Sequence, residues 1–104
     1  MKLWVDDVRP SPDGYVWVKS VNEAKNRLMG CIDYLSYDTI YSCELIDIDH
    51  DAGEYVNDGG DYIKLLDWLE ETGRNYPIRI HSMNPVGVAN MRAIIKRNGW
   101  TEVR

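Results

Sequence analysis

Five short segments of this chain have the hydrophobic pattern and the length of β-strands. They are residues 2–6, 15–18, 43–49, 77–81 and 100–103. The second is aromatic and β-branched, whereas the first, third and fourth are compact apolar runs that end on polar residues.

Amphipathic stretches between these strands predict three helices. One begins at Ser20, which can form a capping box with Glu23, and could end at Gly30. A second runs from Tyr62 to Gly73, and a third from the N-cap Asn84 to Gly99. Residues 31–42 fit neither period, and we interpret them as an irregular connection that has room for a further helical turn.

From the second strand onward, strands and helices alternate, which predicts a parallel sheet with helical crossovers. The first link differs, because residues 8–14 are fewer than the roughly dozen residues that a parallel crossover usually takes. The second strand is therefore either joined by an unusually tight loop or antiparallel. Residues 1–104 have the size of one domain.

Composition narrows the classes of partner. The net charge is −5 and no basic stripe occurs, which argues against binding to duplex DNA. A small phosphorylated substrate or an RNA end is still a possible partner, because a bound metal would offset the charge of the acidic groups. No apolar stretch reaches the length of a membrane span, and Met1 leads directly into a strand. Cys31 and Cys43 form no disulfide framework, so we expect a cytoplasmic protein.

Polar clusters follow three of the predicted strands. If those strands are parallel neighbours, the clusters meet at the carboxyl edge of the sheet, where open α/β folds bind ligands. The clusters are Asp6-Asp7, Asp49-His50-Asp51 and His81-Ser82.

The carboxylates of these clusters predict a metal site. Asp6, Asp7, Asp49 and Asp51 would repel one another at one edge unless raised pKa values, a basic side chain or a divalent cation balanced them. Hard oxygen ligands of this kind suit Mg²⁺ or Mn²⁺. The alternative is that they are solvated residues at loop starts, where aspartate is common.

The two histidines of the chain both fall inside the clusters. His50 and His81 are candidates for general acid or base on a phosphoester, and Ser82 for a hydroxyl donor to a phosphate oxygen. The alternative for each histidine is a structural ring bonded to a carboxylate.

Arg9 and Asn84 are candidate phosphate-binding residues. A guanidinium suits a phosphate beside a metal, and the helix start after Asn84 presents backbone N–H groups. Neutralisation of the acid pair and simple helix capping explain the same residues.

The order of these landmarks resembles a receiver domain, and more closely the cyclic-phosphate processing receiver-like domains. The resemblance rests on Leu3 to Pro10, Asp13 to Trp17, Ile48-Asp49-His50-Asp51 and His81-Ser82-Met83-Asn84-Pro85-Val86-Gly87. It implies a single three-layer receiver-like (flavodoxin-like) α/β domain with a mostly parallel sheet of four to five strands. Relative to that fold, we expect the first crossover helix to be replaced by a loop and the last helix to be missing.

Three functions follow as hypotheses. The resemblance implies a metal-dependent phosphoesterase acting on a cyclic phosphate of a nucleotide or RNA end, with Asp49, His50, His81 and Ser82 as candidate catalytic residues. The alternatives are a stand-alone receiver phosphorylated on Asp49 and a non-catalytic nucleotide- or protein-binding module. The absence of a lysine after the last strand, where signalling receivers place one, disfavours the receiver.

Overall fold

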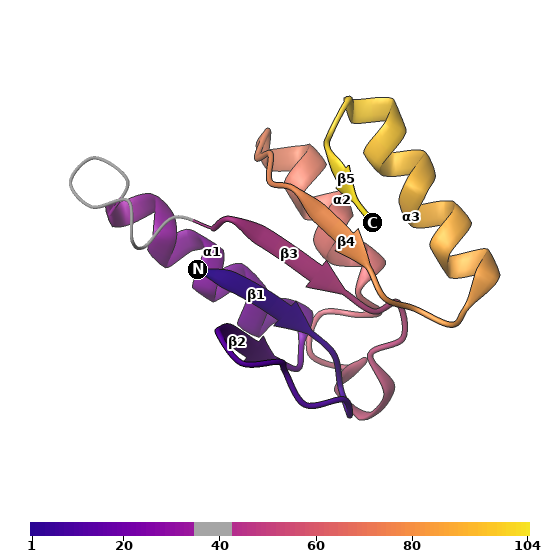
Figure 1. Ribbon diagram of the computed structural model, residues 1–104, viewed down its shortest axis with the longest axis horizontal. Coiled ribbons are helices and arrows are strands. Elements are labelled where there is room, and N and C mark those ends of the chain that lie inside the picture. The colour runs from indigo at the N-terminus through magenta and orange to yellow at the C-terminus, as the bar shows by residue number, and fades with distance from the viewer. Residues whose placement is uncertain (35–42) are drawn as a thin grey trace.

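The computed structural model of the protein describes residues 1–34 and 43–104, with the backbone alone for residues 31–34. The sheet lies in front of the helices in Figure 1. In chain order the elements are β1 (Lys2–Val5), β2 (Tyr15–Val18), α1 (Val21–Tyr34), β3 (Leu45–Ile48), the 3₁₀ turn η2 (Gly53–Tyr55), α2 (Ile63–Thr72), β4 (Ile78–Ile80), α3 (Pro85–Asn98) and β5 (Glu102–Val103).

The five strands form one sheet in the order β2-β1-β3-β4-β5, and every neighbouring pair is parallel. The second strand is thus parallel to the first, although only a loop joins them. Trp4 has Trp17 as its register partner on one side and Asp47 on the other. The predicted α/β class, with a parallel sheet centred on β3, is confirmed.

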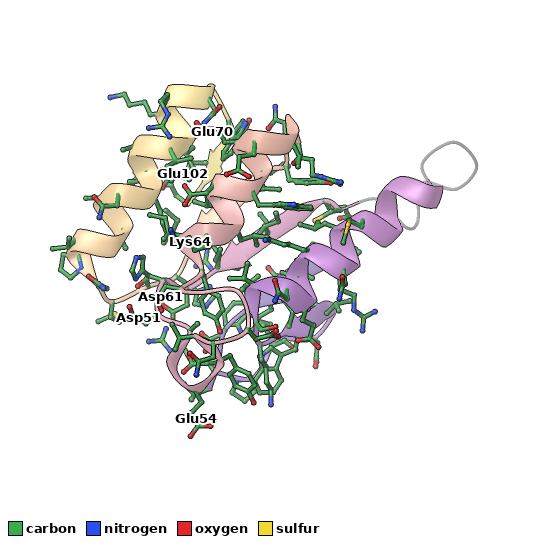
Figure 2. The ribbon with its side chains drawn as sticks, turned by 180° about the vertical axis from the view of Figure 1, so that it is seen from behind. Asp51, Glu54, Asp61, Lys64, Glu70 and Glu102 are labelled. Carbon is green, nitrogen blue, oxygen red and sulfur yellow. The ribbon has the colours of Figure 1, made fainter. Side chains whose placement is uncertain are left out.

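The strand order explains why all three helices cover the same face. Parallel crossovers are almost always right-handed, so the side on which a helix lies depends on the direction in which the chain moves across the sheet. The links through α1, α2 and α3 all move from β2 toward β5, whereas the link from β1 to β2 moves the opposite way. Figure 2 views the molecule from the opposite side, and there the helices lie in front of the sheet.

The opposite face of the sheet carries none of the helices α1, α2 and α3 (Figure 1). There the loop between β1 and β2 lies where a crossover helix between these two strands would be expected. It contacts two tryptophans of that face: the Trp4 indole Nε1 donates to the carbonyl of Arg9 at 2.8 Å, and the Trp17 indole donates to that of Asp6 at 2.8 Å. Among the described residues, the expected third layer is therefore represented by this loop and not by helices.

The hydrophobic core fills the space between the helices and the sheet. Because side chains alternate across a strand, every second strand residue points to the helices. Burying each large aliphatic side chain contributes about 1.5–3 kcal/mol, an upper estimate. The fully buried strand members of this core are Leu3, Val5, Val18, Ile46, Ile48 and Ile78.

The helix ends follow the predicted signals at α2 and α3. Gly73 and Gly99 cap them in the left-handed conformation, and the Asn84 side chain accepts a hydrogen bond from the Gly87 N–H at the start of α3. The prediction that α1 ends at Gly30 is wrong, because the helix continues to Tyr34. Most of the predicted irregular connection, residues 35–42, lies outside the described residues. No helix in the described part of the chain is long and apolar enough to cross a bilayer.

Candidate functional site

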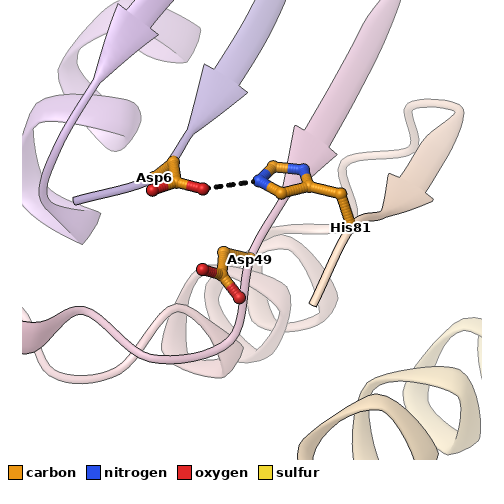
Figure 3. A group of neighbouring side chains, drawn as sticks. All are labelled: Asp6, Asp49 and His81. Carbon is orange, nitrogen blue, oxygen red and sulfur yellow. Dashed lines mark hydrogen bonds and ion pairs between the residues drawn. The ribbon is translucent and has the colours of Figure 1, made fainter. Parts of the chain in front are cut away.

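Three of the predicted residues converge where β1, β3 and β4 end. Asp6, Asp49 and His81 each offer one ligand atom, and these atoms lie within 4.8 Å of one another (Figure 3). Each residue follows the last residue of its strand, and the three strands are adjacent and parallel. The pleat therefore directs all three to the face without helices.

Asp6 is fully buried, and both of its carboxylate oxygens have hydrogen-bond partners. Its Oδ1 accepts from the backbone N–H groups of Val8 at 2.9 Å and Arg9 at 2.8 Å, and its Oδ2 lies 2.9 Å from Nε2 of His81. Burial raises the pKa of Asp6, but these backbone bonds and the His81 ring outweigh it, so its pKa lies below the ordinary value of 3.8. The carboxylate is therefore ionised at neutral pH.

His81 is held on both edges and on one flat side. Its Nδ1 lies 2.7 Å from Oδ1 of Asp47, and its Nε2 faces Asp6. The indole of Trp4 stacks on the imidazole with ring centroids 3.9 Å apart and an interplanar angle of 4°. Only 7% of the side chain is exposed, so the ring has one well-defined orientation.

Asp47 is the site residue that the sequence reasoning missed. It lies in the middle of β3, its side chain is 1% exposed, and its Oδ2 accepts from Nη1 of Arg79 at 3.0 Å. Buried aspartates are rare unless they are paired. The signal that would have found it is an acid flanked by Ile46 and Ile48 inside an otherwise apolar strand.

Asp7 lies close to the group but outside it. A Cβ at Gly53, whose φ is +54°, would collide with Oδ2 of Asp7, so the loop after β3 approaches this carboxylate closely. Burial raises the pKa of Asp7 against an opposing backbone hydrogen bond, and the charges of Asp6 and Asp49 raise it further. Because these two charges reach it, a cation beside Asp6 and Asp49 would also stabilise ionised Asp7.

A phenol lies within reach of the same charges. Tyr62 is fully buried just before α2, and its hydroxyl donates to the carbonyl of Lys19 at 2.8 Å. Burial and the negative charges of Asp7, Asp6 and Asp49 raise the pKa of Tyr62, so this hydroxyl stays protonated.

His50, Asp51 and Asn84 form a second, separate set beside the start of α3. Nδ1 of His50 lies 2.8 Å from Oδ1 of Asp51, and the Asn84 amide lies 3.4 Å from that same oxygen. The His50 ring packs so closely on Gly87 that a Cβ there would collide with it. The backbone N–H of His50 donates to Asp49 at 2.7 Å, which joins this set to the first.

Arg9 and Ser82 lie at the rim of the site. Nη1 of the exposed Arg9 donates to the backbone carbonyl of His81 at 3.1 Å. The Ser82 hydroxyl accepts from the N–H of Asn84 at 3.1 Å, which supports the turn into α3. Their predicted roles toward a phosphate remain predictions.

The donor set fits a divalent cation. Two carboxylates provide hard oxygen ligands, and the imidazole adds a nitrogen that Mn²⁺ and its neighbours accept more readily than Mg²⁺. The prediction that Asp51 also binds the metal is untested. Its carboxylate, 62% exposed, faces His50 and lies outside the group of three.

Comparison with known proteins places the chain in a family. Neither the curated proteins nor the solved structures give a match. The family model of the cyclic-phosphate processing receiver domain matches residues 1–97, and the chain therefore belongs to that family.

Proposed function

We propose that this protein is a metal-dependent phosphoesterase that processes a cyclic phosphate on a nucleotide or an RNA end. The observation that carries the proposal is the Asp6–Asp49–His81 group, which gathers two carboxylates and an imidazole at one sheet edge. The family description, cyclic-phosphate processing, agrees with this chemistry.

Asp6 and Asp49 would hold Mg²⁺ or Mn²⁺, and Asp7 would add negative charge beside it. When bound, such a cation polarises phosphoryl oxygens and lowers the pKa of a bound water. The ionised state of Asp6 favours binding, because no proton has to be displaced from its carboxylate.

The remaining residues have roles that depend on their position at the rim. Arg9 is exposed and has further guanidinium N–H groups beyond the one that donates to the His81 carbonyl, so it can bind a phosphate oxygen. The ring of His50 is 15% exposed and is oriented by Asp51, which suits an acid–base role toward a leaving oxygen. The Ser82 hydroxyl holds the backbone of Asn84, and the Asn84 amide lies 3.5 Å from Nδ1 of His50, so these two residues would help to present this ring and the start of α3 to a substrate.

The decisive experiment measures hydrolysis of a panel of 2′,3′-cyclic nucleotides, and of an oligonucleotide that ends in a cyclic phosphate, during titration with Mg²⁺ and Mn²⁺. We expect turnover that needs the cation and that stops with chelator. Asp49→Asn should lower kcat/KM by more than about 100-fold, since even outer partners of metal ligands change activity by about 10–100-fold.

Asp67→Asn is the matched control, because that carboxylate lies on α2 and is 40% exposed. It should retain wild-type turnover. Hydrolysis that survives chelator, or an Asp49→Asn variant as active as Asp67→Asn, would contradict the proposal.

A stand-alone receiver is the second candidate, because Asp49 follows the central strand and lies beside Asp6. Incubation with a small phosphodonor separates the two functions. A stable acyl phosphate on Asp49 without any turnover of cyclic substrates would favour the receiver, whereas turnover without labelling favours the phosphoesterase.

A further inference from the structure

We propose that Asp47 is a positioning residue for His81: it accepts the Nδ1 hydrogen and so directs Nε2 toward Asp6 and Asp49. Its consequence for catalysis rests on the proposed function, whereas its effect on the ring does not. Asp47 lies inside β3 and belongs to none of the polar clusters at the strand ends.

The ring orientation follows from two short contacts. Nδ1 lies 2.7 Å from Asp47 and Nε2 lies 2.9 Å from Asp6. Turning the imidazole over by 180° would replace both nitrogens by carbons, and neither carboxylate would keep a ring nitrogen as its partner. Trp4, stacked parallel to the ring, prevents intermediate tilts. Only the observed orientation satisfies both contacts.

Asp47 is itself held so that it can orient another group. One oxygen faces Nδ1 of His81, and the other accepts from Nη1 of Arg79 at 3.0 Å. With its side chain 1% exposed, this carboxylate depends on these donors, because a buried charge is costly unless it is paired. Arg79, whose side chain is 43% exposed, is the second of these donors.

The arrangement matches the way proteins orient metal-binding histidines. Such a histidine usually donates its second ring N–H to a carboxylate, which fixes the tautomer and makes the facing nitrogen more basic. With Nδ1 bonded to Asp47, Nε2 either donates to Asp6 or offers its lone pair to a cation between Asp6 and Asp49. Asp47 thereby selects the nitrogen that serves the site.

The first test is a long-range ¹H–¹⁵N spectrum of the imidazoles, recorded without metal. The chain has two histidines, His50 and His81, so their signals can be assigned with one His50→Gln variant. We expect a hydrogen-bonded proton on Nδ1 of His81 in the wild-type protein. An unprotonated Nδ1 there would overturn the proposal, and this measurement needs no substitution at Asp47.

The second test uses Asp47→Asn, which keeps the size of the side chain. Its amide has one acceptor oxygen for two donors, His81 Nδ1 and Arg79, so the Nδ1 proton should be partly or wholly lost. Arg79→Met is the control: it removes the guanidinium but leaves the carboxylate, and it should retain that proton. A spectrum of Asp47→Asn identical to wild type, or equal loss in both variants, would contradict the assignment to Asp47.

The third test measures Mn²⁺ affinity by calorimetry on the same proteins. Asp47→Asn should bind Mn²⁺ about 10–100-fold more weakly, as expected for an outer partner of a ligand, and Arg79→Met should stay within about threefold of wild type. Unchanged Mn²⁺ affinity in Asp47→Asn would contradict the proposal that Asp47 positions His81 for metal binding.

These outcomes separate the inference from the proposed function. If no cyclic phosphate is hydrolysed but the Nδ1 proton and Mn²⁺ affinity depend on Asp47, the phosphoesterase proposal fails and the positioning role stands. If hydrolysis occurs and neither quantity depends on Asp47, the reverse holds.

Discussion

The two faces of the sheet use the same strands for different purposes. On the face toward the helices, Leu3, Ile46 and Ile78 are fully buried in an apolar core. On the other face, Trp4 and Asp47 are also buried, but by ring stacking, ion pairs and the β1–β2 loop. One face thus supplies stability and the other supplies a rigid polar network, although successive residues of the same strands point to opposite faces.

The largest effect should come from the helix face. Ile46→Ala removes a fully buried side chain and should lower the free energy of unfolding by about 2–5 kcal/mol, because it leaves a cavity in the core. Urea denaturation measures this change. The folded fraction should keep its Mn²⁺ affinity. A loss of affinity in fully folded protein would contradict the division of stability and metal binding between the two faces.

On the other face, Trp4→Phe should have a smaller effect on stability. It retains an aromatic ring for His81 but loses the indole bond to the Arg9 carbonyl, which costs about 0.5–1.5 kcal/mol. Because this bond ties down the loop that carries Arg9, we expect KM for a cyclic phosphate to rise more than kcat falls. A fall in kcat alone would contradict this link between loop and substrate.

Gly87→Ala tests the contact between α3 and the second set of site residues. Alanine favours helices over glycine by about 1 kcal/mol, yet its Cβ would collide with the His50 ring. We expect little net change in stability and a displaced His50, visible as shifted imidazole signals. Gly30→Ala is the control, since nothing lies within 4 Å of a Cβ there, and it should raise stability without moving either histidine.

The smallest effects should distinguish the neighbours Asp6 and Asp7. The pKa of Asp6 is depressed by its donors against burial, so its contribution to stability is present above pH 3.8 and is lost as the pH falls through its lower folded pKa. Burial raises the pKa of Asp7, so stability is lost as the pH rises from 3.8 through its folded pKa. At neutral pH and without metal, Asp6→Asn should be less stable than wild type and Asp7→Asn more stable.

Urea unfolding at pH 7 and below pH 3.8 measures both variants. The differences from wild type should shrink in acid. If both variants change the free energy of unfolding in the same direction at pH 7, the two carboxylates do not have opposite environments.

The sequence predicted most of the architecture, because strand patterns and helix caps are local signals. Asn84, Gly73 and Gly99 mark helix ends that the structure confirms. The prediction that the first helix ends at Gly30 was wrong, since a glycine with open space around it is tolerated inside a helix. The direction of β2 was open, because a loop of that length allows both directions.

The site was predictable in outline but not in detail. Strand-end position identified Asp6, Asp49 and His81 among other polar residues, but it could not separate them from Asp51, whose carboxylate contacts its neighbour His50 and the N-cap residue Asn84 instead. Asp47 was missed because a strand interior was assumed to be apolar. Its role depends on Arg79 and His81, which lie 32 and 34 residues away in the chain.

The contact between His81 and Asp6 joins residues 75 positions apart. Contacts of such separation close only after the chain has lost the entropy of a long loop, and they depend on every strand pairing between them. The strand that carries Asp6 and the strand that carries His81 are both neighbours of β3, so the group exists only when all three are paired. If the proposed metal binds at this group, its affinity would therefore report on completion of folding, and truncated or misregistered chains should lack it entirely.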